Sequence, residues 1–400
     1  MGERMQGLPN FNYKVASGAN ESVVMNVIRR RGPISRVDIA KLTDLTPPTV
    51  TNITNKLMEW NYITEYMIGE SSGGRRPVLL KANPDLADLV VIKARSREIV
   101  GYLINGGFEI KKQISHSIKD VKQEDALSLL LETIEACLAE SSSTVAAVGI
   151  IVRGPVKFSE GISVFAPNIG WRNVPLKFIV EDKFHIPTFV ENDVQAMAQG
   201  EYYYGPDREA KSLIFLGVSY GLAAGIVING ELYRGLSNSA GEFGHTTVDV
   251  AGPVCSCGNY GCLEALASEA ALVAAMVKSI KEGRDSLVCD LVDGDMEAVR
   301  AEHVYQAAEQ GDELAGRILR QIARYLGIGV ANIINIFNPE MVIIGDGIVR
   351  GRKFIEETMQ QTIRERALES CYGPASIRFS ATGDESMLKG IVDLVLRNIL

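Results

Sequence analysis

Four residues with metal-binding side chains lie close together in the second half of the chain. His245 is followed, after nine intervening residues, by Cys255, Cys257 and Cys262, with glycines between the last two cysteines. Thiolates and an imidazole form the kind of four-ligand set that zinc prefers, and a closed shell of this kind leaves no position for a reacting water. The spacing therefore predicts a structural zinc site. The alternative is a loop with free thiols.

The segment before residue 84 has the pattern of a small helical domain followed by a hairpin. Apolar residues recur at helical spacing at 23–28, after Ser35 and at 48–57, and a short turn separates the second and third helices. Strand-like runs at 62–66 and 78–80 then bracket a glycine-rich stretch. This order predicts a winged helix-turn-helix that binds DNA. The alternative is a solvated loop after a small helical domain.

The side chains expected to contact DNA fall on two elements. Polar residues at the start of the second helix and along the third would contact phosphates or base edges. Arginines at the tip of the wing would enter a narrow minor groove. The candidate DNA-binding residues are Arg36, Thr49, Thr51, Asn52, Lys56, Arg75 and Arg76.

Charge is distributed unevenly along the chain. Residues 1–83 carry 11 Lys and Arg against 7 Asp and Glu, whereas the remainder carries 30 against 42. A basic head on an acidic body is typical of a protein whose head alone approaches a polyanion, but the small excess does not decide the matter. Apolar runs are too short for a membrane span and the first thirty residues lack a signal-peptide pattern. We therefore expect a cytoplasmic protein without membrane insertion.

Strand-like and helical runs alternate beyond the linker-like sequence Asn83-Pro84-Asp85. The clearest strand-like runs are 145–152, 188–190, 212–218, 225–228 and 341–344, and the long helical runs are 124–140 and 312–337. This alternation predicts α/β layers.

The cysteine cluster belongs to a longer motif. Glu-x-Gly-His at 242–245, followed by Cys-x-Cys-Gly-x-x-Gly-Cys-x-Glu at 255–264, resembles the signature of the ROK family (repressors, open reading frames and kinases). The resemblance extends over most of the chain, with further similar segments at 166–171, 191–193, 217–230 and 338–345, and at Glu201. The winged head, with its Gly-Arg-Arg-Pro sequence, resembles the repressor branch of the family, and in particular regulators that respond to xylose, N-acetylglucosamine or glucose.

The resemblance implies a fold and a set of sugar-binding residues. The implied fold is α/β, with an N-terminal winged helix-turn-helix (1–83) before a two-lobed, actin-like sugar-kinase domain (84–193 with 380–400, and 194–379). By motif position, sugar hydroxyls would be bound by Asn192, Asp193, Glu242, His245 and Glu264. His245 would then bind zinc through one ring nitrogen and the sugar through the other. For the other four of these residues, the alternative is that each has an ordinary role as a helix cap, a turn residue or a solvated surface residue.

The first hairpin of the body decides whether such a protein phosphorylates its sugar. A kinase of this fold needs glycines there, so that backbone N–H groups reach the phosphates, and an acidic residue that helps to hold magnesium. The corresponding segment, 90–99, has no glycine and no acidic residue at its turn, and the second phosphate loop, 217–225, keeps its glycines but carries the bulky Tyr220. We therefore expect a non-enzymatic, sugar-responsive repressor of carbohydrate-utilisation genes.

Two other functions stay open. The first is a sugar kinase that also binds DNA, with Arg95 and Arg97 forming an unusual phosphate site. The second is a regulator whose effector is a protein. The expected partners of the repressor are a palindromic operator, a small sugar and further copies of the chain, because helix-turn-helix proteins commonly read two half-sites. The resemblance implies a dimer or a tetramer.

Overall fold

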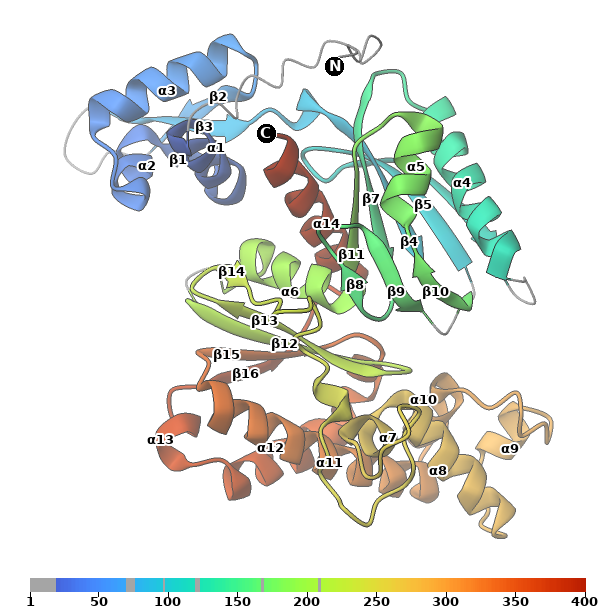
Figure 1. The fold of residues 1–400 in the computed structure, drawn as a ribbon. Helices are drawn as coiled ribbons and strands as arrows, with labels where there is room; N and C mark the ends of the chain where they lie inside the picture. Colours follow the sequence, from blue (N-terminus) through green and yellow to red (C-terminus); the bar gives the residue numbers. More distant parts are fainter. Residues whose placement is uncertain (1–18, 70–75, 96–97, 119–122, 167–168, 208–209) are drawn as a thin grey trace. The chain divides into compact units, whose positions relative to one another are not determined.

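The computed structural model describes residues 19–69, 76–95, 98–118, 123–166, 169–207 and 210–400. In the described part of the head, helices α1 (Ala19–Arg31), α2 (Arg36–Thr43) and α3 (Pro47–Glu59) pack on a small sheet of strand order β1-β3-β2 (Figure 1). Its strands are β1 (Ile34–Ser35), β2 (Ile63–Ile68) and β3 (Val78–Ala82). The arrangement of α2 and α3 is that of a helix-turn-helix, and β2 and β3 form the predicted hairpin.

Local capping fixes where the head helices begin. The Ser35 hydroxyl accepts the backbone N–H of Asp38 at the start of α2. The Thr46 hydroxyl accepts the N–H of Thr49 at the start of α3, where two prolines occupy the first positions. These side chains satisfy donors that have no partner within the helix, and proline costs little at a helix start. The apolar faces then share one core, which includes Val24, Ile28, Ile39, Ile53, Leu57 and Leu80.

A mixed sheet follows the head, with strand order β11-β7-β4-β5-β6. Its strands are β4 (Asp88–Ala94), β5 (Glu98–Asn105), β6 (Ile110–Ser117), β7 (Val145–Val152) and β11 (Thr188–Asn192). Strands β4, β7 and β11 are parallel, whereas β4, β5 and β6 are antiparallel. The short 3-10 helix η2 (Pro84–Leu86) links the head to this sheet. A small antiparallel sheet lies between β7 and β11 in sequence, formed by β8 (Val156–Lys157), β9 (Ile162–Ala166) and β10 (Trp171–Val174).

Helices cover both faces of this mixed sheet. On one face, α4 (Gln123–Ala139) and α5 (Leu176–Phe184) share a core with Val90, Ile92 and Val148. On the other face lies α14 (Asp384–Ile399), whose Ile391 and Val395 pack over Gly149 of β7. The end of the sequence thus supplies one layer of a sheet that begins near residue 88.

A second mixed sheet has the order β14-β13-β12-β15-β16. Its strands are β12 (Ser212–Val218), β13 (Leu222–Ile228), β14 (Glu231–Leu232), β15 (Met341–Gly345) and β16 (Ser376–Phe379). The associated helices are η4 (Phe243–His245), α7 (Leu263–Ala267), α8 (Glu269–Lys281), α9 (Val288–Leu291), α10 (Ala301–Glu309), α11 (Glu313–Phe337), η5 (Gly347–Gly351), α12 (Arg352–Arg366) and α13 (Glu369–Tyr372). The apolar face of α11 forms the centre of its core.

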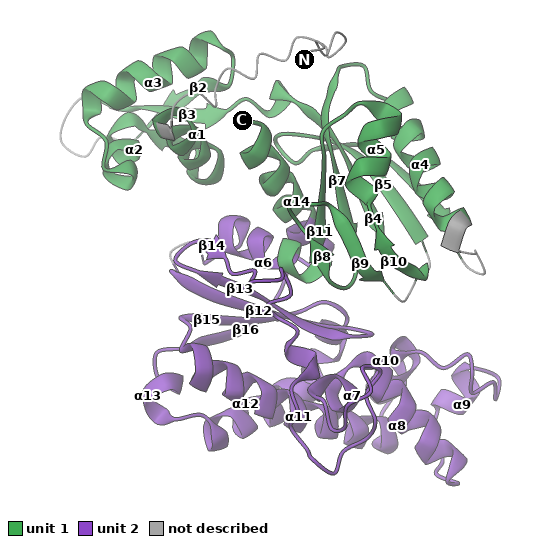
Figure 2. Ribbon diagram, in the orientation of Figure 1, with its two compact units in different colours: residues 1–196, 388–400 green, residues 197–387 purple. Residues whose placement is uncertain are grey.

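The chain divides into two compact units, residues 1–196 with 388–400 and residues 197–387 (Figure 2). The head therefore belongs to the same unit as the first mixed sheet. Both changes of unit fall inside continuous helices, in α6 (Asp193–Tyr204) and in α14. Within the described residues, no helix is both long and apolar enough to cross a membrane.

Candidate functional site

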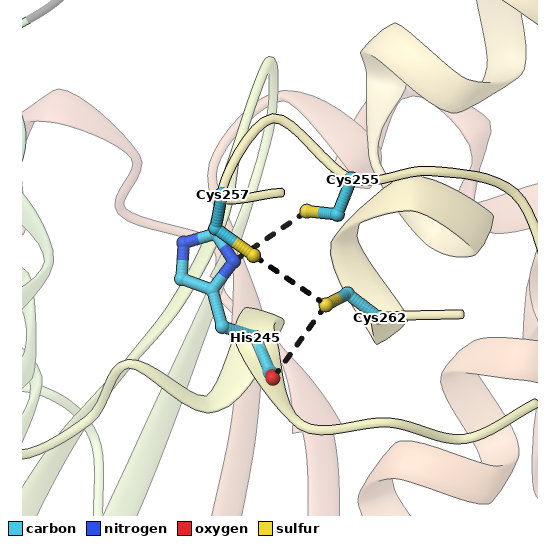
Figure 3. A group of neighbouring side chains, drawn as sticks. All are labelled: His245, Cys255, Cys257 and Cys262. Carbon is cyan, nitrogen blue, oxygen red and sulfur yellow. Dashed lines mark hydrogen bonds between the residues drawn. The ribbon is translucent and has the colours of Figure 1, made fainter. Parts of the chain in front are cut away.

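The predicted metal ligands come together in the second unit. One ligand atom from each of His245, Cys255, Cys257 and Cys262 lies within 4.8 Å of every other (Figure 3). His245 ends η4, Cys255 and Cys257 lie on the following loop, and Cys262 directly precedes α7. The loop is closed by bridges between Thr247 and Cys262 and between its own ends at 254 and 260. The cluster is able to hold a metal ion.

Two distances within the cluster match those expected around a tetrahedral ion. The sulfurs of Cys257 and Cys262 are 3.8 Å apart, and the Cys255 sulfur is 3.6 Å from Nδ1 of His245. Two sulfurs that each lie about 2.3 Å from one tetrahedral zinc are about 3.8 Å apart, and such a sulfur lies about 3.6 Å from a coordinating imidazole nitrogen. Burial raises the pKa of the Cys262 thiol to about 12, so a cation is needed to hold this group as a thiolate.

Glycine at 261 allows the loop to close around the cluster. Gly261 has a φ of +61°, and a Cβ at this position would lie 1.5 Å from the carbonyl oxygen of Asp249. The Gly261 N–H donates to the carbonyl of Pro253 across the loop. Any larger residue would therefore displace Cys262 from its neighbours.

His245 connects the cluster to the first of the predicted sugar residues. Its Nδ1 faces the sulfur of Cys255, and its Nε2 lies 3.9 Å from Oε2 of Glu242 (Figure 3 shows the ring and the sulfurs). The Glu242 side chain is exposed, and His245 is partly exposed. One ring nitrogen therefore faces the metal ligands while the other faces a carboxylate at the surface of the same loop.

Glu264 has a bracing role that its motif position did not indicate. Its Oε2 accepts the backbone N–H of Leu222, and its Oε1 accepts the hydroxyl of Ser256. The carboxylate thus ties the cysteine loop to the β12–β13 turn. Glu264 therefore has a structural contact in addition to the sugar contact that its motif position implies.

Asn192 and Asp193 lie in the first unit, where β11 ends and α6 begins. The Asn192 amide donates to the carbonyl of Gly154, and its oxygen accepts the N–H of Gln195 as a helix cap. Oδ2 of the buried Asp193 lies 3.5 Å from Nε of Arg153. Sequence reasoning missed Arg153. Arg153 directly follows β7, and β7 is parallel to β11. Residues that follow parallel strands lie at the same edge of the sheet, and this rule would have predicted that Arg153 lies near Asp193.

The first hairpin of the body is formed by β4 and β5. The N–H of Arg95 donates to the carbonyl of Glu98, while Ser96 and Arg97 lie outside the described residues. Lys93 is buried in β4. In the second unit, the β12–β13 turn carries the exposed Tyr220. The first hairpin therefore presents no glycine-lined turn in its described part, whereas the β12–β13 turn keeps Gly221 beside Tyr220.

A buried carboxylate lies against the turn that follows β15. The N–H of Glu269 donates to the carbonyl of Ser219, next to Tyr220, and a Cβ at Gly347 would lie 2.5 Å from its Oε1. Burial raises the pKa of Glu269, although Arg350 and the Tyr305 hydroxyl lie 3.2 and 3.0 Å from Oε1. The two turns at the carboxyl ends of β12 and β15 thus share an acidic neighbour.

The candidate DNA-binding residues differ in their surroundings. Thr51 and Asn52 are exposed on α3, and Arg76 is exposed at the base of the hairpin. The Thr49 hydroxyl bonds to that of Thr46, and Thr51 donates to the carbonyl of Pro47. Arg75 lies outside the described residues.

Arg36 and Lys56 have partners within the head. Nε of Arg36 donates to the Thr54 hydroxyl, and the guanidinium also contacts the sulfur of Met58. Lys56 lies 3.5 Å from Glu21 of α1. These contacts point the Arg36 side chain at α3, so a phosphate contact would require it to exchange partners.

Solved structures define the class of protein to which this fold belongs. A crystal structure of a ROK family transcriptional regulator, a homolog of the E. coli MLC protein, matches with a TM-score of 0.81 and 30% identity over 95% of this chain and 96% of that chain. A ROK family glucokinase from Streptomyces griseus, solved with glucose and AMPPNP, matches with a TM-score of 0.67 and 29% identity over 77% of this chain and 99% of that chain. The body therefore has the sugar-kinase fold of these proteins, as predicted.

Sequence comparison identifies the family. The ROK family model matches residues 98–398. The xylose repressor of Caldicellulosiruptor bescii is 35% identical over 393 residues, which cover 97% of this chain and 98% of the relative. The chain belongs to the ROK family, and this prediction is confirmed.

Proposed function

We propose that this chain is a sugar-responsive DNA-binding repressor whose kinase-like body binds a sugar without phosphorylating it. The observation that carries the proposal is a helix-turn-helix head joined, in one chain, to a sugar-kinase-like body with a His and Cys cluster. The similarity to named repressors over nearly the whole chain supports it. The proposal keeps the predicted division of the chain into a head (1–83), a first lobe (84–193 with 380–400) and a second lobe (194–379).

The sugar site that we propose contains Asn192, Asp193, Glu242, His245 and Glu264, the last of which also ties the cysteine loop to the β12–β13 turn. Carboxylate, amide and imidazole groups suit sugars because hydroxyls both donate and accept hydrogen bonds. Zinc is the metal that we propose for the cluster, since its ligand set and distances suit a closed tetrahedral site. Bound zinc would hold the His245 ring so that Nε2 stays directed at the sugar.

Two features of the body disfavour phosphoryl transfer. The first hairpin lacks the glycines and the acidic residue that phosphate and magnesium require. Glu269, whose carboxyl group packs against Gly347 and whose backbone N–H donates to Ser219 at the β12–β13 turn, places a hydrogen-bond acceptor beside these two turns, where a polyphosphate would need donors.

We propose that the head binds DNA through Thr49, Thr51 and Asn52 of α3 and through Arg75 and Arg76 of the wing. Lys56 and Arg36 would assist only after exchanging their present partners. An oligomer, a dimer or a tetramer, would present two heads to a palindromic operator. Such a regulator acts in the cytoplasm.

The test uses the purified full-length protein. An operator is first selected from a random DNA library. Calorimetry then measures binding of D-xylose, N-acetylglucosamine and D-glucose, and the affinity for the operator is compared with and without each sugar. We expect D-xylose to bind, by similarity to the xylose repressor, and to change operator affinity. Absence of any selected DNA sequence contradicts the proposal.

A sugar kinase that also binds DNA is the second candidate function, because a glucokinase shares the body fold. An assay of ADP release with ATP, magnesium and each of the three sugars separates the two. Turnover of about 1 per second or more, ordinary for kinases, would establish the enzyme. If DNA binds but no sugar does, an effector of protein nature becomes the better explanation.

A further inference from the structure

Helix α14 is buried along most of its length because it packs against several elements of the protein. Residues 386–396 are all buried except the partly exposed Lys389. Ile391 and Val395 contact the mixed sheet at Gly149, where a Cβ would lie 2.8 Å from Ile391. Beyond the end of the helix, Leu400 packs against the apolar core of the head. The helix thus contacts the sheet along one side and leads directly into the head core.

A charged cluster joins α14 to the first helix of the head. Asp393, whose side chain is 0% exposed, accepts hydrogen bonds from Arg29 (2.6 Å) and from Nε and Nη2 of Arg30 (3.1 and 2.9 Å). The Arg29 and Arg30 side chains are only 3% and 16% exposed. Two guanidinium groups at the end of α1 therefore converge on one carboxylate in a site shielded from water.

The other end of α14 is fixed to α6. A Cβ at Gly200 of α6 would lie 1.7 Å from the carbonyl oxygen of Ser386, so the two helices touch through their backbones. The next residue of α6, the buried Glu201, accepts hydrogen bonds from the Ser380 and Thr382 hydroxyls, which precede α14. Helix α6 begins at Asp193, a residue of the proposed sugar site.

These contacts form a continuous physical route. It runs from Asp193 along α6 to Gly200, across to α14 at Ser386, and along α14 to Asp393 and α1. Each of the two helices is also where the chain passes from one compact unit into the other. Helices α6 and α14 are therefore the covalent connections between the units, and a displacement at Asp193 would reach Asp393 along them.

A buried ion cluster is better suited to fixing an orientation than to adding stability. Desolvation offsets most of the attraction, so well-packed apolar residues would stabilise this contact equally well. In contrast to apolar packing, the hydrogen bonds of Asp393 require specific positions of both guanidinium groups. Small shifts of α14 would break them, and the contact is therefore sensitive to the position of the helix.

We propose that Asp393 is a positioning residue that couples the sugar site to the DNA-binding head, through its contacts with Arg29 and Arg30. The inference rests on the proposed function and adds the route of regulation. In the sugar-free protein the cluster sets the orientation of α1, and with it that of α2 and α3. Sugar binding displaces α14 and alters this orientation.

The first test compares D393N with the wild-type full-length protein, because asparagine keeps the size of the side chain but removes its charge. We expect the effect of D-xylose on operator affinity to fall from about 5-fold or more to less than about 2-fold. D-xylose affinity, measured by calorimetry, should stay within about 3-fold of wild type. A general loss of structure would lower this affinity together with the sugar response, so the difference between the two measurements identifies the coupling. N398A, an exposed position on the same helix, should behave as wild type. A wild-type response in D393N would overturn the proposal.

Two further measurements keep the result decisive. If circular dichroism finds D393N unfolded, R30K replaces it, since lysine retains the charge but loses the paired hydrogen bonds. An unchanged sugar response in R30K would then overturn the proposal. Hydrogen exchange needs no ligand, and in either variant it should become faster in residues 19–31 and 388–399 together. Unchanged exchange at residues 19–31 contradicts the coupling, whether or not the wild-type protein binds a sugar. A wild-type protein that responds to none of the sugars counts against the proposed function instead.

Discussion

His245 links the metal cluster to the proposed sugar site because its two ring nitrogens face different partners. Nδ1 lies against the Cys255 sulfur, and Nε2 faces Glu242. A metal on Nδ1 fixes the orientation of the ring and leaves Nε2 to donate to a hydroxyl. At the scale of single residues, the proposed sugar site would therefore depend on Nδ1 of His245, an atom that would not itself contact the sugar.

Loss of one metal ligand tests this dependence. We expect Cys257→Ser to hold well under one zinc per chain and to bind sugar more weakly by about 10- to 100-fold, because the His245 ring loses its fixed orientation. Elemental analysis and calorimetry on the same preparation measure both effects. Cys289→Ser, outside the cluster, is the matched control. A variant with full zinc content would show that Cys257 is not a ligand.

Replacing Glu242 separates sugar binding from support of the loop. We expect Glu242→Gln to lose the sugar response while operator affinity without sugar stays within about 2-fold of wild type, since the residue is exposed and belongs to the second unit. Operator titrations with and without D-xylose measure this. Glu282→Gln, another exposed glutamate, serves as the control. If zinc content and melting temperature fall together in Glu242→Gln, the residue braces the loop instead.

Sequence reasoning located the candidate residues better than it predicted their partners. Motif spacing found the His and Cys ligands because a closed metal site requires nearby ligands. Helical periodicity placed Thr51 and Asn52 on the outer face of α3, but it does not report that Arg36 turns toward Thr54. The role of Glu264 as a brace depends on a backbone N–H that lies 42 residues away in the chain. Contacts of this kind follow from the fold and cannot be read from spacing.

At the scale of elements, α3 is the helix expected to enter the major groove. We expect Asn52→Ala to bind its selected operator more weakly by about 1–3 kcal/mol and to discriminate less at one base position, because an amide gives paired contacts to a base edge. Selection of sequences by the variant and binding titrations measure this. Asn398→Ala, on α14, is the control. Unaltered sequence preference would remove Asn52 from the recognition surface.

The long elements were predictable, and the short ones were not. Runs at 145–152 and 212–218 coincide with β7 and β12, because buried strands of a mixed sheet are continuously apolar. The amphipathic pattern of 312–337 gave α11 with Asp312 as its cap. The small sheet of β8, β9 and β10 was missed because strands of two to five residues carry little periodicity. The change from one unit to the other inside α6 and inside α14 also has no counterpart in the local sequence pattern.

At the scale of the whole molecule, sugar and operator should affect each other reciprocally. If D-xylose lowers operator affinity by a given factor, the operator must lower D-xylose affinity by the same factor. We expect a factor of about 5 to 150 for a coupling of about 1–3 kcal/mol. Calorimetry with D-xylose in the presence and absence of saturating operator DNA measures it. A scrambled DNA duplex of equal length is the control, and a D-xylose affinity that is the same with and without the operator would mean that the two sites are not coupled.

The contact between Arg29 and Asp393 joins residues that are 364 positions apart in sequence. A ribosome adds roughly 5–20 residues per second, so the arginines of α1 emerge on the order of 20–70 s before their carboxylate partner. Throughout that interval the nascent head carries its helix-turn-helix and its basic charge, but lacks α14. A growing chain is therefore free to meet DNA before it acquires the contact that we propose to regulate it. Unfinished or prematurely terminated chains that carry a folded head would then compete for operators without answering to sugar.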